Sequence, residues 1–423
     1  MAKSRKKKLV VLWLVFLTLV FVANLVFVTM KTGFKKPEEQ ECFDKIPKME
    51  ITLAETTLEE LNSGSKEVKY SGNNVKISTC GEIEEYNGVE IKGRGNSTWG
   101  QPKNPYQIKF SEKEDLFGMG KARKWVLLAN YLDDSNLRTD VAFYFERLLG
   151  EKYALNGEFI KLSINDEELG LYYLTPKVEI GKSRVDLRDP MGILVELDNL
   201  RPEDEYFSVD GNNLQFKDIV ADDNIEAAEK DFADSLKKIA KAVKKKDLNG
   251  LSKLVDIESM VRYYLLSEFT INPDAYSSSF FMYKDGPDDV IHFGPGWDFD
   301  YGLGNKKWIW ALKDDYYSPF EMSIIQHNSP ALSKNIIWLV DSSEFFELVG
   351  EMYREKLMGR KEEVLSYLDD QADYIWEVAI DDAVMWEQNF VEEYDYLREW
   401  LSNRFDFFDE YFGGMGELDK HML

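Results

Sequence analysis

The stretch from residue 268 to residue 304 most constrains what this chain can fold into. It reads EFTINPDAYSSSFFMYKDGPDDVIHFGPGWDFDYGLG, with apolar runs at Phe280–Tyr283 and Val290–Phe293. A turn rich in Gly and Asp, Asp285–Asp289, separates the two runs. Short apolar runs on either side of such a turn predict a β-hairpin.

Three carboxylates are expected to converge around this hairpin. Asp274 precedes its first strand, and Asp298 and Asp300 follow its second strand. Antiparallel pairing brings these two ends together. Converging carboxylates favour a hard cation, and Mg²⁺ held by one or two carboxylates plus substrate phosphates is a common arrangement. The alternative is that these residues are ordinary turn and cap residues.

The composition is that of a globular protein with one strong charge imbalance. Of its 423 residues, 44% are hydrophobic and 14% aromatic, which is enough to build a sizeable core. There are 52 basic and 77 acidic residues, giving a net charge of −25. Broad nucleic-acid binding relies on Lys and Arg neutralising phosphates, so no nucleic-acid partner is expected.

The N-terminus predicts a membrane anchor. The basic segment MAKSRKKK precedes Leu9–Met30, which carries no charge and is long enough to span a bilayer as a helix. A cleaved signal peptide is the competing interpretation, but its apolar region is shorter. More basic residues lie before the span than just after it, so the rest of the chain is expected outside the cytoplasm. The predicted organisation is a cytoplasmic tail (1–8), anchor (9–30), linker (31–45), main domain (46–412) and C-terminal tail (413–423).

Cysteine and histidine usage limits the chemistry. Cys42 and Cys80 are the only cysteines, and either a disulfide in an oxidising compartment or two free thiols is compatible with their spacing. The three histidines are scattered, so no Cys/His zinc site is expected. The sequence also lacks the Gly-x-Ser-x-Gly motif of many serine hydrolases.

A Gly-rich loop lies within residues 89–110, VEIKGRGNSTWGQPKNPYQIKF. Apolar and polar residues alternate on both sides of it, which predicts two flanking strands. The loop either presents backbone N–H groups to phosphate or is a plain hairpin turn. The alternation places Lys109 with Gln107, opposite Tyr106 and its apolar neighbours. Lys109 is therefore either a solvated strand residue or a phosphate ligand.

Strand patterns dominate the first half of the chain and helix patterns the second, which predicts an α+β fold. Residues 200–223 are acidic and are expected to form a loop. Glu146, on the first predicted helix, is either solvated or an ion-pair partner, and Glu196 and Asp198 are either strand-end or site residues. The expected strands are Met49–Leu53, Val75–Thr79, Glu158–Ile164, Leu171–Leu174 and Gly192–Asp198, and the expected helices are Leu137–Leu149, Asn224–Asp247, Asp256–Glu268 and several between Ser342 and Phe412.

Several sequence blocks resemble the spore-coat CotH family, in order, from about Ile46 to Phe412. The most specific are the RGNSTW block within Gly93–Trp99 and the WDFD block within Pro295–Asp300. The other blocks are Pro102-Lys103, Tyr106–Phe110, Lys124–Asn130, Asp133–Arg138, Asn165–Tyr173 and Asn272–Asp274.

This resemblance implies an atypical protein-kinase-like fold, with a β-rich N-terminal part and a mainly helical C-terminal part. It also implies ATP and Mg²⁺ (or Mn²⁺) as cofactors and phosphorylation of protein Ser or Thr hydroxyls. Asp274 would match the catalytic-loop aspartate and Asp298 the metal-binding aspartate. Lys109 and Arg94 would bind the nucleotide, with Glu146 as the helix partner of Lys109.

The chain departs from the kinase pattern at one position. Kinases place a metal-binding Asn five residues after the catalytic-loop Asp, and here that position is Ser279. Ser279 and Asp300 are therefore the candidates for completing a second metal site beside Asp298.

Two functions follow as hypotheses. The first is a kinase held at the cell membrane by its N-terminal helix and acting on cell-envelope or surface proteins. The second is a scaffold of the cell envelope that keeps the kinase-like fold but has weak or no activity. Nucleotide binding with Mg²⁺ distinguishes the two.

Overall fold

The computed structural model describes residues 45–199, 206–209, 211–307 and 342–414. Contacts divide the chain into Met1–Lys45 and Ile46–Leu423, and every element below belongs to the second unit. The predicted basic tail, the anchor at 9–30, nearly all of the linker and most of the C-terminal tail lie outside the described residues. In the described part, no helix has both the length and the apolar character needed to cross a membrane.

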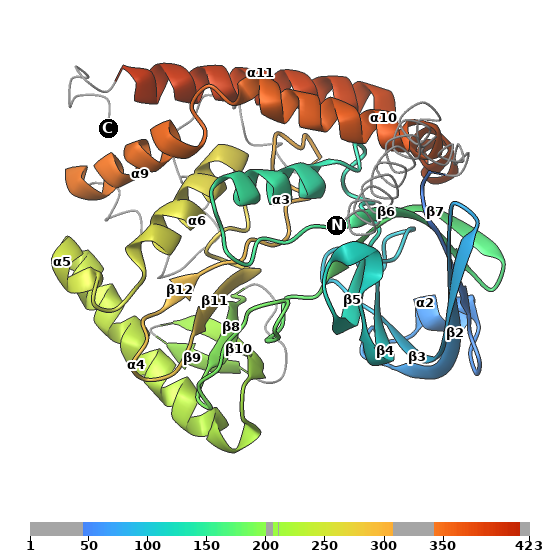
Figure 1. Cartoon of the computed structure of the whole chain (residues 1–423), viewed down its shortest axis with the longest axis horizontal. Helices are drawn as coiled ribbons and strands as arrows, with labels where there is room; N and C mark the ends of the chain where they lie inside the picture. Colours follow the sequence, from blue (N-terminus) through green and yellow to red (C-terminus); the bar gives the residue numbers. More distant parts are fainter. Residues whose placement is uncertain (1–44, 200–205, 210, 308–341, 415–423) are drawn as a thin grey trace, which may run out of the picture. The chain divides into compact units, whose positions relative to one another are not determined.

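Seven strands of the N-terminal part close into a barrel (Figure 1). The first strand, β1, pairs antiparallel with β2 and parallel with β6, which closes the barrel. The sequence predicted a β-rich region here but not its closure. The strand order around the barrel is β1-β2-β3-β4-β5-β7-β6, and the bounds are Lys48–Thr52 (β1), Tyr70–Thr79 (β2), Glu82–Gly93 (β3), Tyr106–Glu114 (β4), Ala122–Leu128 (β5), Glu158–Ile164 (β6) and Glu167–Pro176 (β7).

Alternation along the strands fills the barrel. In β4, Tyr106, Ile108 and Phe110 are buried in the barrel core, whereas Gln107 and Lys109 are half-buried on the opposite face. The predicted orientation of Lys109 is therefore confirmed. The core gains hydrophobic stabilisation because every second side chain along a strand leaves water.

A second, five-stranded sheet carries the predicted hairpin. Its order is β12-β11-β8-β10-β9, and Met282 and Tyr283 of β11 pair with Phe293 and His292 of β12. The hairpin is thus confirmed. The loop expected at 200–223 is wrong for 206–209 and 212–219, where β9 and β10 pair, and residues 200–205 and 210 lie outside the described residues. The bounds are Ile193–Leu197 (β8), Tyr206–Val209 (β9), Asn212–Ile219 (β10), Phe280–Lys284 (β11) and His292–Phe293 (β12).

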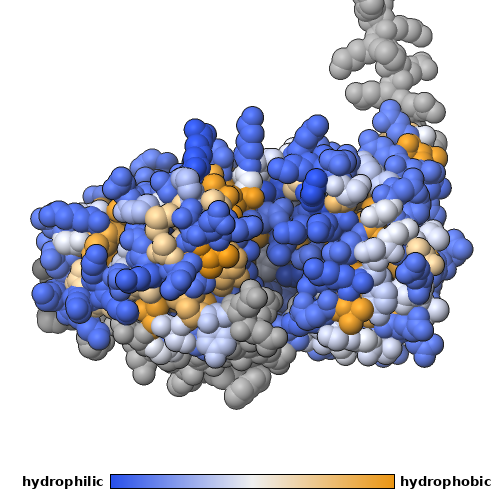
Figure 2. All heavy atoms as spheres, turned by 90° about the horizontal axis from the view of Figure 1, so that it is seen from below, coloured by the Kyte–Doolittle hydropathy of each residue, from blue (hydrophilic) through white to orange (hydrophobic). Residues whose placement is uncertain are grey.

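Helices form most of the C-terminal part, so the mixed α+β class is confirmed. Figure 1 shows α10 running beside α11, and α10 also contacts α3 and β7 of the barrel. Hydrophilic residues cover most of the face seen in Figure 2. The helices are Leu58–Ser63 (α2), Arg138–Leu148 (α3), Ile225–Lys244 (α4), Leu248–Leu251 (α5), Ile257–Thr270 (α6), Ser343–Lys356 (α9), Lys361–Trp386 (α10) and Phe390–Gly413 (α11), with short 3₁₀ helices at Leu116–Gly118 (η1) and Asp222–Asn224 (η2).

One cysteine lies within the described residues. Cys80 follows β2 and is disulfide-bonded, and the described part of the chain holds no free cysteine. Cys42, the other cysteine of the sequence, lies outside the described residues.

Candidate active site

Asn272 holds the two acid-bearing segments together. Helix α6 ends at Thr270, and the left-handed backbone of the next residue, Ile271 (φ 46°), turns the chain away from the helix. The Asn272 side chain then accepts a hydrogen bond from Asp274 N at 3.1 Å and donates one to Asp298 O at 3.2 Å. The turn after α6 and the loop after β12 are therefore fixed to each other.

Ser279 lies directly against Asp298. Its Oγ donates to Asp298 Oδ2 at 3.1 Å, so this pair, predicted from the sequence, is in contact. Tyr276, Ser279 and Asp298 all have left-handed φ values, of 61°, 52° and 67°. Such backbone strain in residues other than Gly concentrates at functional sites.

The predicted carboxylates interact electrostatically. Burial, followed by the charges of Asp298 and Asp198, raises the pKa of Asp274 to about 7. Burial and the charges of Asp298, Asp274 and Asp133 raise the pKa of Asp300 well above its usual range. The structure therefore gathers like charges that repel one another unless a proton or a cation intervenes.

Arg94 of the Gly-rich loop provides a partial counter-charge. Burial raises the pKa of Asp298, while the Arg94 charge and then the Ser279 hydrogen bond lower it. The Arg94 guanidinium lies 5.2 Å from the centre of the Trp297 ring. Both residues line a cavity of about 30 Å³ together with Thr98, Asp298 and Asp300. The loop and the WDFD block thus form one site.

Asp198 joins the site from β8. Its carboxylate accepts a hydrogen bond from Ser278 Oγ at 3.1 Å and a longer one from Asn96 Nδ2 at 3.5 Å. Asn96 belongs to the Gly-rich loop and Ser278 precedes β11, so Asp198 links the two segments. In the sequence, the only feature of Asp198 is its position after an apolar strand, which fits a strand-end residue as well as a site residue.

Glu146 supports the loop that carries Asp298. Its Oε1 accepts a hydrogen bond from Gly296 N at 2.6 Å, and Oε2 has no partner among the described residues. Burial and then the charge of Glu151 raise the pKa of Glu146 to about 8. No ion pair between Glu146 and Lys109 is formed within the described residues. The structure thus places Glu146 behind the loop that carries Asp298 rather than at a strand lysine.

Lys109 belongs to a group of lysines, here called the lysine row, on the outer face of the barrel, where Glu90 is its neighbour on β3. It lies opposite Lys124 in the β4–β5 register, and Lys92 lies opposite Gln107 in the β3–β4 register. Residues directly opposite each other share one face of a sheet. Lys92 and Lys124 pair with Glu67 and Glu179 at 2.7 and 3.1 Å.

Lys177, which follows β7, is the member of this group that sequence reasoning missed. Burial and the charges of Lys124 and Lys217 lower its pKa to about 8. Lys217 itself pairs with Glu196 at 2.6 Å. A partly desolvated lysine beside other cations suits an anionic ligand. The only sequence signal for Lys177 is its position shortly after a predicted strand.

The donor set matches a cation shared with phosphates better than a cage made of protein alone. The described residues contain no group of three or more His, Cys, Asp and Glu side chains arranged to hold a metal ion. Mg²⁺ usually takes one or two carboxylates and substrate phosphates. Asp298, with Ser279 in contact and Asp274 and Asp300 in electrostatic range, provides carboxylates of this kind.

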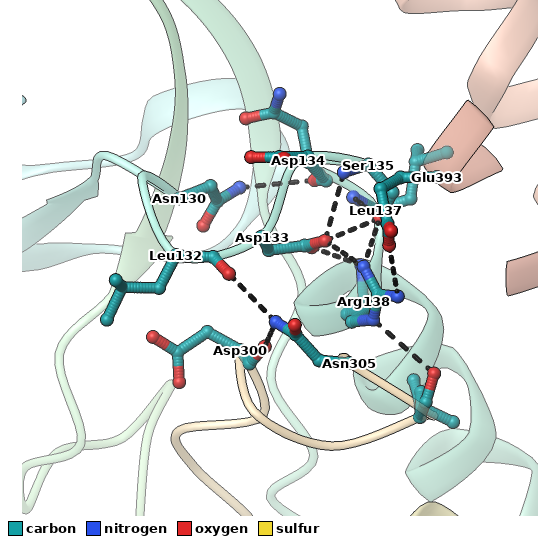
Figure 3. A network of polar contacts seen from close by, with 12 residues as sticks. Asn130, Leu132, Asp133, Asp134, Ser135, Leu137, Arg138, Asp300, Asn305 and Glu393 are labelled. Atoms are coloured by element: carbon teal, nitrogen blue, oxygen red, sulfur yellow. Dashed lines mark hydrogen bonds and ion pairs between the residues drawn. The ribbon is translucent and has the colours of Figure 1, made fainter. Parts of the chain in front are cut away.

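A polar network anchors the backbone around Asp300 (Figure 3). Asn305 Nδ2 donates to Asp300 O at 2.6 Å and to Leu132 O at 2.8 Å. Arg138 contacts Asp133 and donates to Glu393 Oε2 at 2.9 Å. In Figure 3 the Asp300 carboxylate points away from Arg138. The network therefore fixes the backbone of Asp300, while its carboxylate belongs to the acidic site.

Comparison with known proteins identifies the family. No curated protein matches the chain. The family model described as CotH kinase protein matches residues 91–408, which include the Gly-rich loop, the Asn272–Asp274 turn and the WDFD block. The chain therefore belongs to the CotH family of kinase proteins.

Proposed function

We propose that the protein is a membrane-anchored protein kinase, which transfers the γ-phosphate of ATP to Ser or Thr hydroxyls of protein substrates with Mg²⁺ or Mn²⁺. The observation that carries the proposal is the mutual electrostatic interaction of Asp274, Asp298 and Asp300, the last two of which line one cavity with Arg94 of the Gly-rich loop. Phosphoryl transfer depends mainly on positioning and on neutralising charge, and these residues supply both.

Each residue has a distinct proposed role. Asp298 would hold the metal ion, which neutralises phosphate charge when bound, and Ser279 or Asp300 would complete its ligands. Asp274 would accept the proton of the substrate hydroxyl, since a pKa of about 7 suits a general base near neutral pH. Arg94 would bind a phosphate oxygen from the loop side.

The lysine row would bind the nucleotide from the barrel side. Lys109 remains the proposed strand lysine, and Lys177 is a second candidate because burial and neighbouring cations lower its pKa. Glu146 would act indirectly by fixing Gly296 and, through it, the position of Asp298.

Two observations support placing the domain outside the cytoplasm. The uncharged segment Leu9–Met30 follows a basic tail, which is the pattern of an N-terminal anchor with that orientation. Cys80 is disulfide-bonded, and disulfides persist mainly in oxidising compartments. Protease added to intact cells should digest the domain, and protection until lysis would contradict this orientation. Cell-envelope or surface proteins are the proposed substrates.

One observation favours the alternative of a weakly active scaffold that binds protein partners. Ser279 takes the place of the metal-binding amide, and a serine hydroxyl is a poorer Mg²⁺ ligand than an amide oxygen. A scaffold of this kind would keep the fold and lose turnover with labelled ATP.

Calorimetry of the full chain with Mg-ATP tests the proposal. Asp298→Asn should weaken binding at least tenfold because it removes a ligand charge, and each tenfold corresponds to about 1.4 kcal/mol. Asp288→Asn is the matched control, since Asp288 is exposed in the turn between β11 and β12. Equal affinity in the two variants would refute the role of Asp298. Nucleotide binding without transfer of label to protein would favour the scaffold.

A further inference from the structure

A second cavity lies apart from the acidic site. Its volume is about 380 Å³. It forms where the turn containing η1, the segment after α3 and the connection from β7 to β8 meet, and none of its lining residues lines the cavity beside Asp298. Its lining includes Lys152, Tyr153, Lys182, Arg184 and Asp186.

The lining of this cavity is basic in a protein of net charge −25. Lys152, Lys182 and Arg184 carry three positive charges, and Asp186 carries one negative charge, which leaves a lining charge of +2. The Asp186 carboxylate already accepts a hydrogen bond from Arg188 at 3.0 Å. Lys152 lies with its Nζ 4.6 Å from the centre of the Tyr153 ring, at the edge of the cavity. Lys152 and Lys182 are exposed, as surface lysines commonly are, whereas Arg184 is not.

Arg184 is buried although it carries a charge. Only 7% of the residue is exposed, and its guanidinium lies 4.9 Å from the centre of the Trp125 ring. Nη1 donates to Met119 O at 3.0 Å and to Ser183 O at 2.7 Å. Nε and Nη2 have no hydrogen-bond partner within the described part of the chain. Buried donors are nearly always paired, so these two nitrogens call for an acceptor.

The position of Arg184 is fixed by its surroundings. Gly120 has a φ of 83°, and a Cβ placed there would lie 2.5 Å from Ser183 Cβ. The η1 turn therefore packs directly against the segment that carries Arg184. A guanidinium has the planar fork of donors that suits oxyanions, and in Arg184 the half of this fork that has no partner among the described residues is buried beside the cavity.

We infer that this cavity binds a phosphate group, either free inorganic phosphate or the phosphate monoester of a phosphorylated side chain. Arg184 would supply the central donors, and Lys152 and Lys182 would lie around the ligand. A phosphate monoester carries a charge of about −1.5 to −2 at neutral pH, which matches the net charge of the lining. The inference does not require that the protein transfers phosphate, because the cavity shares no residue with the acidic site.

Calorimetric titration of the full chain with inorganic phosphate and with a phosphoserine peptide, both without nucleotide, tests the inference. Lys152→Ala/Lys182→Ala should weaken binding of both probes at least tenfold, because two charge-assisted contacts are lost. Lys238→Ala/Lys241→Ala on α4 removes the same net charge from exposed positions elsewhere and should change nothing. Arg184→Lys, which keeps the charge and loses the fork, should also weaken binding, provided that its melting temperature stays near that of the parent.

The outcomes separate the two sources and the two sites. Tighter binding of the peptide than of inorganic phosphate would identify a phosphorylated side chain as the ligand, and equal binding would identify free phosphate. Binding that survives Lys152→Ala/Lys182→Ala, or no saturable binding at millimolar concentrations, would overturn the inference. So would binding that is lost only in Asp298→Asn, since phosphate would then occupy the acidic site.

Discussion

Two sets of charged groups in this protein differ in how their charges are balanced. Lys103 Nζ lies 2.8 Å from both carboxylate oxygens of Asp382, and neither side chain is exposed. Leu171 accepts from Lys103 and donates to Asp382, at 2.5 and 2.7 Å. Asp274, Asp298 and Asp300, in contrast, repel one another.

This difference in charge balance distinguishes the Lys103–Asp382 pair, which supports the fold, from the acidic site. Burial lowers the pKa of Lys103 and raises that of Asp382, while their mutual attraction opposes both shifts. In the acidic site burial and repulsion raise the pKa of Asp274 and Asp300 together. A satisfied buried pair rigidifies a fold, whereas an unsatisfied group is typical of a functional site.

The largest expected effect is on the satisfied pair. Lys103→Met should lower the free energy of unfolding by about 3–5 kcal/mol, because Asp382 is left buried and unpaired. Lys103→Met/Asp382→Leu should recover most of this loss. Lys76→Met, which breaks the exposed pair with Glu50, should cost no more than about 1 kcal/mol. Denaturant melts measure all three, and equal costs for Lys76→Met and Lys103→Met would contradict the comparison.

Removing a charge from the acidic site should raise the free energy of unfolding instead of lowering it. The pKa of Asp274 rises from 3.8 to about 7 on folding, so the folded state binds more protons than the unfolded state between these values. Stability is therefore lost as pH rises through this range. Asp274→Asn removes the loss and should be more stable than the parent by up to about 4 kcal/mol at pH 8, with little difference at pH 4.

Thermal melts across this pH range measure the effect of Asp274→Asn. Mg²⁺ should raise the melting temperature of the parent more than that of the variant, because the variant has lost a repulsion for the cation to relieve. A variant less stable than the parent at pH 8 would show that the acidic site is scaffold.

Lys177 gives an effect of intermediate size. If it binds nucleotide phosphate as a cation, affinity should fall as pH rises through its pKa of about 8. Lys177→Met should weaken Mg-ATP binding about tenfold at pH 7 and remove most of this pH dependence. A hydrogen bond to a charged group contributes about 1.5–3 kcal/mol in a desolvated site, and less when the group is half-buried. Lys109→Met, titrated in parallel, tells which lysine of the row contacts the ligand.

Ser279 should give the smallest effect. Ser279→Ala removes the hydrogen bond to Asp298 and should weaken Mg²⁺ affinity about fivefold, the equivalent of about 1 kcal/mol. Ser279→Asn should strengthen it, because Asn tolerates the left-handed backbone of this position (φ 52°) and offers an amide oxygen. Identical Mg²⁺ affinities in the parent and both variants would exclude Ser279 from metal binding.

Local structure was largely predictable from the sequence, and long-range structure was not. The predicted strand Glu158–Ile164 is β6, and the predicted helix Asp256–Glu268 corresponds closely to α6, Ile257–Thr270. These patterns are contained within a few turns or one strand. Nothing in the local pattern of β1 could reveal its parallel pairing with β6.

The candidate site, too, was predictable where its residues are close in sequence and not where they are distant. Asp298 and Ser279 were predicted and lie in contact, because one hairpin brings them together. Asp198 reaches the site at the end of β8 in the second sheet, and Lys177 joins the lysine group from the β7–β8 connection. No spacing in the sequence encodes either placement. Lys103, in a Pro- and Asn-rich segment typical of a surface loop, gave no sign that it is buried.

The closure of the barrel has a consequence for how the protein is made. Leu53 at the end of β1 hydrogen-bonds to Asn165 across a sequence separation of 112 residues, and Lys103 reaches Asp382 across 279. Contacts this distant give a high contact order, which slows folding because long loops must close before the contacts form. During synthesis on the ribosome, Lys103 of the barrel part cannot pair with Asp382 until α10 has been made. A nascent chain that has not yet extended past Trp386 should therefore remain a client for chaperones.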